Sequence, residues 1–346
     1  MSLLLTALQD FRAQAPDLDQ WTLRPSNYGA WDLALTQTNG PMSFITPDLQ
    51  AKFNAAVNNN VFIPVFDAQA VTIGNTRLVS IPDSENDSRL YQVPFTRYHW
   101  GFTIAPAVYM GNEIQIQADF NRKMRKYLLQ FLSVLDSAVL SVLEANKTQV
   151  FANLLGQYAT AGNTVNATLA QQDNVIGSST ALMNANDYYG RFHFLGEPGM
   201  QDRIQQLAEK GVMNSENKQL QYADKILGFT NRLANAAGKK ATAFMINDGS
   251  LGVVTRQEPE AILGTKSATG HEWMVTQLPG LGIPVSAYYY ESVGDYSAMA
   301  GAGSAHADRA MKRHYAFSVD VGIIPAFIND LTTIASPIMK LDIAST

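Results

Sequence analysis

Residues 119–153 read DFNRKMRKYLLQFLSVLDSAVLSVLEANKTQVFAN, and this stretch decides the fold. No Gly or Pro occurs between Gly111 and Gly156. Apolar side chains recur at helical spacing and form one wide stripe: Phe120, Met124, Tyr127, Leu128, Phe131, Leu132, Leu135, Val139, Leu143 and Val150. A helix of about 30 residues would be about 45 Å long, far beyond the average of about 11–12 residues. The pattern therefore predicts one long helix with a structural role.

The residues before this helix predict a β-ribbon. Residues 61–71 are typical of a strand that enters a core, and 71–81 and 89–105 are typical of the two arms of a hairpin. The tip, PDSENDS at 82–88, is polar and favours a turn. Ile114-Gln-Ile116-Gln alternates as a strand does. A two-stranded ribbon is marginally stable alone, so we expect it to rest on a partner surface.

The first 60 residues are typical of an arm. Leu3, Leu4, Leu8 and Phe11 indicate a short amphipathic helix. The residues after it are rich in Asn, Gln, Pro and Gly and show little periodicity, so they cannot bury themselves well alone. We expect either a loose tail or a segment that lies along another surface.

The chain after Gly156 has a mixed α/β pattern. Residues 157–195 are polar and typical of loops, a helix is expected from Pro198 to Gly211, and a second helical segment at 217–236. Strands are expected at 241–246, 273–278, 283–290, 315–327 and 337–344. No internal repeat or linker divides the chain into independent domains.

Composition restricts the chemistry that is available. The chain has no cysteine, which excludes disulfides, thiolate nucleophiles and iron–sulfur clusters. Charged residues make up 16%, against about 25% in an average protein, while Asn, Gln, Ser and Thr are plentiful. Such a surface suits extensive subunit contact, because burying an amide costs less than burying a charge. The net charge of −5 indicates no strong attraction to nucleic acid.

Neither the N-terminus nor the longest apolar region predicts export or membrane insertion. The N-terminal residues lack a basic segment followed by a long apolar run, so we expect no secretory signal. The apolar region at 127–143 is interrupted by Gln130, Ser133, Asp136 and Ser137, so we expect no membrane span.

Catalytic and metal-binding patterns are incomplete. A nucleophile elbow needs Gly two residues before and two residues after its Ser; Ser250 has Asp248 in the first place, and Ser304 has neither glycine. No phosphate-binding glycine loop occurs. His306, Asp308 and His314 have a suggestive spacing, but a metal needs three or four convergent ligands, so hydrogen-bonded loop histidines are the simpler interpretation. We expect no enzymatic activity and no cofactor or metal.

The order of elements, namely arm, long hairpin, strand, very long helix, α/β region and closing strand, resembles the major capsid proteins of tailed bacteriophages. FMINDGS at 244–250 and LPGLGIPV at 278–285 also resemble that family. The resemblance implies an α+β, Hong Kong 97-type capsid fold with an N-terminal arm, an extended β-hairpin loop, a long spine helix, a peripheral domain and an α/β axial domain.

Placed on this chain, the resemblance implies the following ranges. The N-terminal arm would be 1–60, and the peripheral domain 61–156, with the extended loop at 71–105 and the spine helix at 119–153. The axial domain would be 157–312, and strands at 313–346 would return to the peripheral domain.

The function that the resemblance implies is self-assembly. Hexamers and pentamers would build an icosahedral head, assembled in the host cytoplasm, that encloses double-stranded DNA in the virion. Scaffolding, portal and cementing proteins are expected partners, DNA contact would be non-specific, and no membrane is expected. An encapsulin-type cellular nanocompartment and a soluble α/β enzyme with an unrecognised site are the alternatives.

Candidate inter-subunit contacts are charged residues at two places. On the ribbon they are Arg77, Asp83, Glu85, Asp87, Arg89 and Arg97; on the long helix they are Arg122, Lys123, Arg125 and Lys126. The helix cations either form a solvated face or contact an acidic neighbouring arm or DNA. They would lie at the unfavourable, positive end of the helix dipole if the helix began at Asp119.

The ribbon also departs from the family pattern. Some relatives join subunits through a lysine of the extended loop, but this chain has no lysine at 71–105. Arginine is always protonated and cannot be that nucleophile, so we expect non-covalent contacts. Deletion of 74–98 is expected to abolish assembly and leave the α/β region folded.

Overall fold

The computed structural model describes residues 3–13, 29–55, 61–67, 88–148, 158–160, 164–209, 221–222, 225–233, 238–264, 270–294, 310–328 and 335–345. The helices in these ranges are α1 (Leu3–Ala13), α3 (Gly29–Asn39), α4 (Pro47–Ala55), α5 (Glu113–Ala145), α6 (Gln172–Asn184), α7 (Pro198–Glu209) and α8 (Pro259–Ile262), with the 3-10 turns η2 (Pro106–Tyr109) and η4 (Leu169–Gln171).

The strands form three sheets in the described part of the chain. The small sheet contains β1 (Phe62–Asp67), β2 (Ser88–Gln92) and β14 (Phe327–Ile328). The long sheet contains β3 (Thr96–Ile104), β10 (Leu251–Arg256), β11 (Glu272–Gln277), β12 (Pro284–Gly294) and β13 (Ala310–Pro325). The seven-stranded sheet contains β4 (Ala159–Thr160), β5 (Val165–Ala167), β6 (Phe192–Gly196), β7 (Gln221–Tyr222), β8 (Lys225–Phe229), β9 (Lys239–Asn247) and β15 (Ile338–Ala344).

Helix α5 is the predicted long helix, but it begins and ends at other residues than the predicted 119 and 153. It runs unbroken for 33 residues from Glu113 to Ala145, which corresponds to about 50 Å. The side chain of Asn112 caps it by accepting a hydrogen bond from the Ile114 N–H at 3.1 Å. The strand expected at Ile114–Gln117 was therefore wrong, because Ile116 lies one turn before Phe120 on the same buried stripe.

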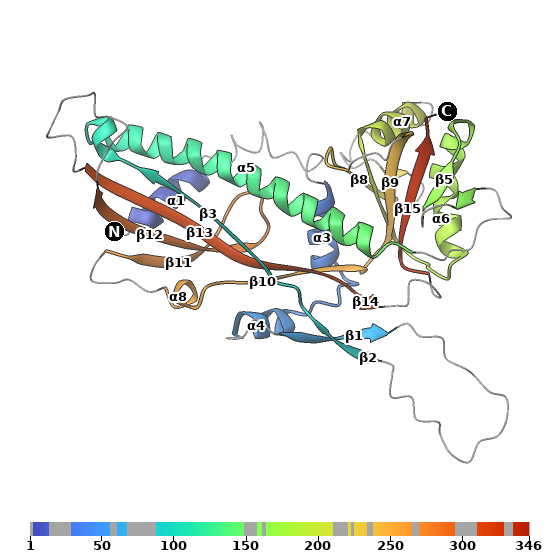
Figure 1. The fold of residues 1–346 in the computed structure, drawn as a ribbon, viewed down its shortest axis with the longest axis horizontal. Helices are drawn as coiled ribbons and strands as arrows, with labels where there is room; N and C mark the ends of the chain where they lie inside the picture. The colour runs from blue at the N-terminus through green and yellow to red at the C-terminus, as the bar shows by residue number, and fades with distance from the viewer. Residues whose placement is uncertain are drawn as a thin grey trace, which may run out of the picture.

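The long sheet and α5 pack together along the length of the molecule (Figure 1). Strand β13 pairs along one edge with β12 and then with β10, and along its other edge with β3. The aromatic side chains on its inner face meet those of α5, and the ring centroids of Phe120 and Tyr315 are 4.8 Å apart. At the sheet's far end Arg313 donates two hydrogen bonds of 3.0 Å to Glu113. We call α5 and this sheet the long half.

Among the described residues α5 is the helix long and apolar enough, by composition, to cross a membrane. Buried core helices meet the same criterion. The apolar stripe of α5, from Ile116 to Leu143, lies in the hydrophobic core with strands of the long sheet. Packing against protein therefore accounts for its apolar composition.

The seven-stranded sheet with α6 and α7 forms a second body, which we call the compact half (Figure 1). The predicted helix after Pro198 is confirmed, and Met200 and Ile204 are fully buried. Two local predictions were wrong. Residues 157–195, predicted as loops, contain α6 and β6, and residues 217–236, predicted as helical, contain β8, which pairs in parallel with β6.

The range 157–312, predicted as one axial domain, does not form one packed unit. Strands β10, β11 and β12 fall within this range but belong to the long sheet, where β12 pairs with β13 from Ser286 to Gly294. The prediction grouped strands by their order in the chain, whereas antiparallel pairing with the long β13 decides their place.

The extended loop predicted at 71–105 also needs correction. Its described part begins where β1 pairs with β2, with Phe66 opposite Ser88. Residues 68–87 lie outside the described residues. The return arm separates after β2: Pro94 has no N–H to give a ladder, and β3 pairs instead with β13, with Trp100 opposite Phe317. The deletion of 74–98 would therefore cut into the long sheet.

The described parts of the predicted arm lie on the chain's own core, which contradicts our expectation of either a loose tail or a segment that lies along another surface. Leu4, Leu8 and Phe11 of α1 are buried, and the Phe11 ring meets Phe120 of α5 edge-on. Trp31 of α3 is fully buried and its indole N–H donates to Leu281 O at 3.0 Å. The sequence shows weak periodicity here because each helix is short and buried against several elements. Residues 14–28 lie outside the described part.

Candidate inter-subunit surface

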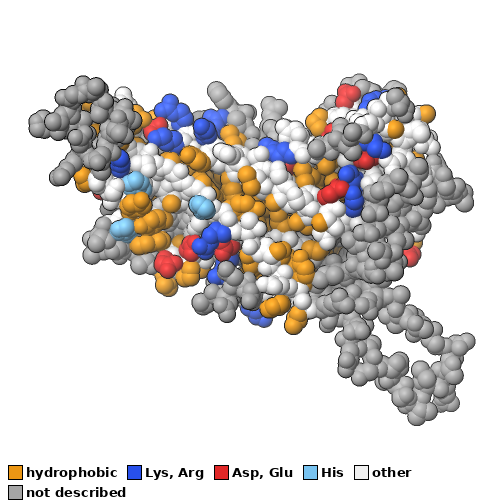
Figure 2. All heavy atoms as spheres, in the orientation of Figure 1, with side chains coloured by type: hydrophobic (Ala, Val, Ile, Leu, Met, Phe, Trp, Pro, Cys, Tyr) orange, Lys and Arg blue, Asp and Glu red, His pale blue; other side chains and the backbone are white. Residues whose placement is uncertain are grey.

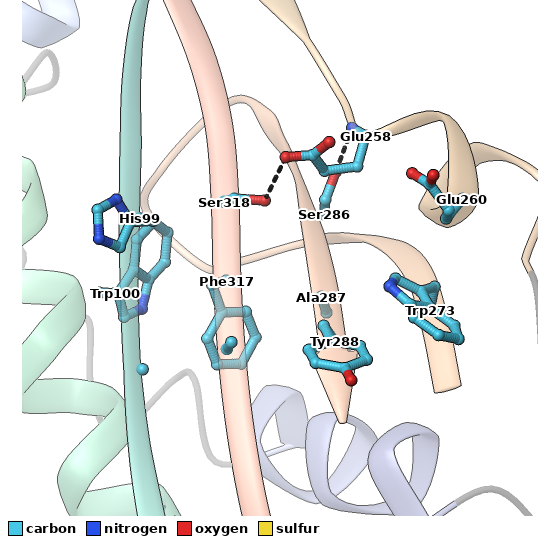
Figure 3. A pocket seen from close by; sticks show the side chains of 12 residues that line it. His99, Trp100, Glu258, Glu260, Trp273, Ser286, Ala287, Tyr288, Phe317 and Ser318 are labelled. Atoms are coloured by element: carbon cyan, nitrogen blue, oxygen red, sulfur yellow. Dashed lines mark hydrogen bonds between the residues drawn. The ribbon is translucent and has the colours of Figure 1, made fainter. Parts of the chain in front are cut away.

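A trough of about 410 Å³ lies on the face of the long sheet that points away from α5 (Figure 3). Alternate residues of neighbouring strands share this face, and here several are small, including Gly101, Ala316 and Ser318. A Cβ at Gly101 would lie 2.8 Å from the Tyr315 carbonyl oxygen, so β3 and β13 approach too closely for any larger residue.

Three polar residues of the trough, Glu258, Ser286 and Ser318, are paired with one another. Ser286 Oγ accepts from the Glu258 N–H at 2.8 Å, and Ser318 donates to the Glu258 carboxylate at 3.5 Å (Figure 3). Arg97 bridges Glu258 at 3.1 Å and Asp320 at 3.0 Å. This arrangement braces α8 against the sheet. A search of the described ranges finds no group of three His, Cys, Asp or Glu that could hold a metal.

A row of stacked rings continues this face toward the end of the sheet. It crosses three strands, with centroid separations of 4.7 Å for Trp273–Tyr288, 5.3 Å for Tyr288–Tyr290 and 4.4 Å for Tyr290–His314. His314 also bonds the hydroxyls of Thr103 at 2.9 Å and Ser292 at 2.7 Å. Burial lowers its pKa. His314 is thus a hydrogen-bonded histidine, whereas His306 and Asp308 lie outside the described residues.

The basic residues of α5 lie well inside the helix. Because α5 begins at Glu113, they avoid the first turn, where the helix dipole would disfavour them. Arg122 and Lys123 form ion pairs with Asp119 at 3.1 and 2.8 Å, and Arg122 is exposed. Burial acts to raise the pKa of Asp119, but these hydrogen bonds outweigh it and the pKa is lowered. Arg125 is half-buried and Lys126 is exposed.

A second groove, of about 440 Å³, lies where α5 meets β3. Tyr98, Tyr127, Phe131 and Val134 line it. Figure 2 shows hydrophobic side chains across the middle of this face of the molecule, with acidic and basic groups between them. Lys126 and Arg97 directly precede Tyr127 and Tyr98, which line this groove.

The remaining predicted contacts lie on the ribbon. Arg89 is on β2 opposite Val65. The other four lie outside the described residues: Arg77, Asp83, Glu85 and Asp87.

The chain is similar to solved phage capsid structures. The capsid of cyanophage P-SCSP1u gives a TM-score of 0.44 at 10% identity, over 84% of this chain and 85% of that one. A structure of Microbacterium phage Oxtober96 gives 0.44 at 14% identity, over 88% and 95%. The SrpI encapsulin of Synechococcus elongatus PCC 7942 gives 0.34 at 12% identity, over 86% and 88%. No protein-family model and no curated protein matches.

Sequence reasoning missed the polar residue on which the two halves meet. Asp136 of α5 is fully buried, and it accepts hydrogen bonds from the N–H groups of Ala30 at 2.9 Å and Trp31 at 3.0 Å. It also accepts from the Thr230 hydroxyl at 2.5 Å. The available signal was an aspartate beside Leu135 in the apolar stripe, which we interpreted as an interruption only.

Replacement of Arg97 with Ala is expected to lower the free energy of unfolding by less than about 1 kcal/mol, because exposed ion pairs contribute roughly 0.2–1 kcal/mol. The Arg97 side chain is 57% exposed. Glu258→Gln is the matched control, since it weakens the same bridge and keeps Arg97. Denaturant unfolding and light scattering measure stability and assembly. An assembly defect in R97A alone supports an inter-subunit contact, and equal small effects contradict one.

Proposed function

We propose that this chain is the major capsid protein of a tailed bacteriophage, which self-assembles into hexamers and pentamers of an icosahedral shell around double-stranded DNA. Its place would then be the virion. The predicted order of elements supports this: ribbon, unbroken long helix, α/β body and closing strand all occur in that order in the described chain.

The observation that carries the proposal is apolar exposure at two distant places on an elongated molecule. At the ribbon base, Phe62 of β1 is 51% exposed and Leu90 of β2 is 72% exposed. At the other end, Met110 is 97% exposed and Ile114 is 82% exposed (Figure 1). Burial of each such side chain would contribute about 1.5–3 kcal/mol. Contacts with further copies at both ends would cover them and extend in two directions, as a shell requires.

The ribbon base rests on the body by one face. Ile63 and Val93 are buried with Val254 and Ile324 of the long sheet, while Phe62 and Leu90 point outward. A strand pair with one anchored face and one exposed apolar face suits contact with a neighbouring copy. The ribbon charges from Arg77 to Arg97 and the α5 cations Arg122, Lys123, Arg125 and Lys126 are proposed to contribute to such contacts.

The contents and partners of the shell follow from the proposal. Contact with packaged DNA would be electrostatic and independent of sequence. Scaffolding, portal and cementing proteins would be its assembly partners, and the shell would need no catalysis. Ser286 and Ser318 form hydrogen bonds with Glu258 in the trough, which supports a structural role for that face.

Electron microscopy and analytical ultracentrifugation of the purified full-length chain test this function. Closed shells or ring-shaped capsomers are expected, and nucleic acid that copurifies would distinguish a phage head from a shell that holds an enzyme cargo. A compact monomer over the whole accessible concentration range, with or without macromolecular crowding, would contradict the proposal.

A further inference from the structure

Helix α3 lies between the two halves of the molecule and is tied to both. On the compact half, Gly29 packs so closely on β8 that a Cβ there would lie 2.3 Å from the Phe229 carbonyl oxygen. On the long half, the Trp31 indole bonds Leu281 O, and Gln37 Oε1 accepts from the Leu251 N–H at 2.8 Å. Helix α3 therefore helps to hold the two halves together, beside direct contacts such as the ion pair between Lys340 of β15 and Glu144 of α5.

The N-terminus of α3 donates hydrogen bonds to a buried carboxylate. Asp136 reaches it from α5 and receives the Ala30 and Trp31 N–H groups and the Thr230 hydroxyl. Arg232 lies 3.8 Å from Asp136 and also bonds Ser133 of α5 at 2.7 Å. Burial raises the pKa of Asp136, and these donors and this cation act against that rise. Asp136 is therefore the member of the site better equipped to carry a negative charge.

A second carboxyl group lies at the same place without such support. Asp32 is in the first turn of α3, and its Oδ2 is buried with no hydrogen-bond partner in the described residues. Burial, and secondarily repulsion from Asp136, raise the pKa of Asp32 to about 7. The positive end of the helix dipole favours ionisation of Asp32 only weakly, which does not offset burial beside a like charge.

Other charged groups around α3 lie elsewhere or are engaged. At the opposite end of α3, the Asp248 carboxylate lies 4.0 Å from where a Gly40 Cβ would be and pairs with His193 of β6 at 3.3 Å. Lys225 of β8 donates to the Ile176 carbonyl oxygen of α6. Strand β10 meets α3 through the N–H groups of Leu251 and Val253.

We propose that Asp32 and Asp136 form a proton-controlled joint between the long half and the compact half. A proton on Asp32 leaves one negative charge at the site, which the α3 N–H groups, Thr230 and Arg232 stabilise. When that proton is lost to solvent, two negatively charged carboxylates lie in the buried junction, and Arg232 is the one guanidinium described near them. The second charge is relieved when the start of α3 moves enough to admit water, so the two halves loosen relative to each other above neutral pH.

The sign of the effect follows from linkage. Because the folded chain holds the Asp32 proton more tightly than the unfolded chain, stability from this group is full at acid pH. It declines as pH rises from the ordinary carboxyl range toward about 7 and is lost above it. The two halves are therefore held together most stably at mildly acidic pH. The joint belongs to a single chain, so it can be measured whether or not the chain assembles.

The chain has no cysteine, so pairs of spin labels can be placed uniquely. Ala118→Cys on α5 and Ala181→Cys on α6 replace exposed residues on the two halves. The doubly labelled full-length chain is diluted with unlabelled chain. Pulsed electron–electron double resonance then gives the distance between the two labels, and so between the two halves. Between about pH 5 and pH 9 we expect the distance distribution to broaden, and the protection factors of α3 amides to fall about tenfold.

Asp32→Asn keeps the shape of the protonated carboxyl and removes its charge. It is expected to keep the narrow, acid-form distribution at all pH values. Asp48→Asn is the matched control, because Asp48 lies in the first turn of α4 and is exposed; it should leave the wild-type pH response unchanged. If D32N does not fold, Asp32→Ala replaces it. An unchanged wild-type distribution across this pH range, or an equal pH response in the Asp32 variants, overturns the joint.

Discussion

Replacement of residues 68–86 with Asn-Gly is expected to abolish shell assembly and to leave the chain folded. The pairing of Phe66 with Ser88 leaves one position on each strand before the turn, and Asn-Gly is the preferred two-residue hairpin turn. The shortened ribbon keeps the buried contacts of Ile63 with Val254 and Ile324.

Sedimentation velocity should shift from shells or capsomers to monomer, with a thermal unfolding transition close to wild type. A triple variant, Asp83→Asn, Glu85→Asn and Asp87→Asn, keeps the ribbon length and removes its acidic charge. If charge pairing with another copy matters, that variant should assemble with a weaker dependence on salt. Shells at wild-type yield from the shortened chain would refute the role of the ribbon in assembly.

Replacement of Asp136 with Ala should have the largest effect on folding of any single substitution considered for this chain. The Ala30 and Trp31 N–H groups, the Thr230 hydroxyl and the nearby Arg232 would lose their shared acceptor. Removal of one partner from a buried charge pair costs about 3–5 kcal/mol, a large part of the about 5–15 kcal/mol that stabilises a typical domain. The N-terminus of α3 would lose the hydrogen bonds that hold it on α5.

Urea unfolding of D136A, followed by circular dichroism, measures this cost. Asp136→Asn keeps one acceptor oxygen and should fall between D136A and wild type. Ser137→Ala, at the adjacent exposed position of α5, is the control and should change stability by less than about 0.5 kcal/mol. A D136A penalty of under about 1 kcal/mol would show that the buried carboxylate does not hold α3.

The candidate contacts show how far sequence reasoning extends to the surface. It found the charged residues of α5 from their spacing, and Arg122 and Lys126 are exposed as a contact surface requires. It could not find their local partners. Arg97, predicted on a free ribbon, lies on β3 and bridges Asp320 and Glu258, which are distant in sequence. Whether these residues also contact other copies stays a prediction.

Local sequence patterns determined the elements that carry their own signal. The apolar stripe of α5 predicted a long helix because its period is that of a helix over many turns, and β9, β12, β13 and β15 were predicted because strand-forming residues dominate them.

Tertiary structure alone decided which elements are neighbours. Strands β10 to β12 join the long sheet because β13 is long enough to pair with several strands. Asp136 becomes a helix cap because α3, more than a hundred residues earlier in the chain, begins against it. Pairing and burial depend on surfaces that are far apart in the chain, and the periodicity of one segment does not specify its partner.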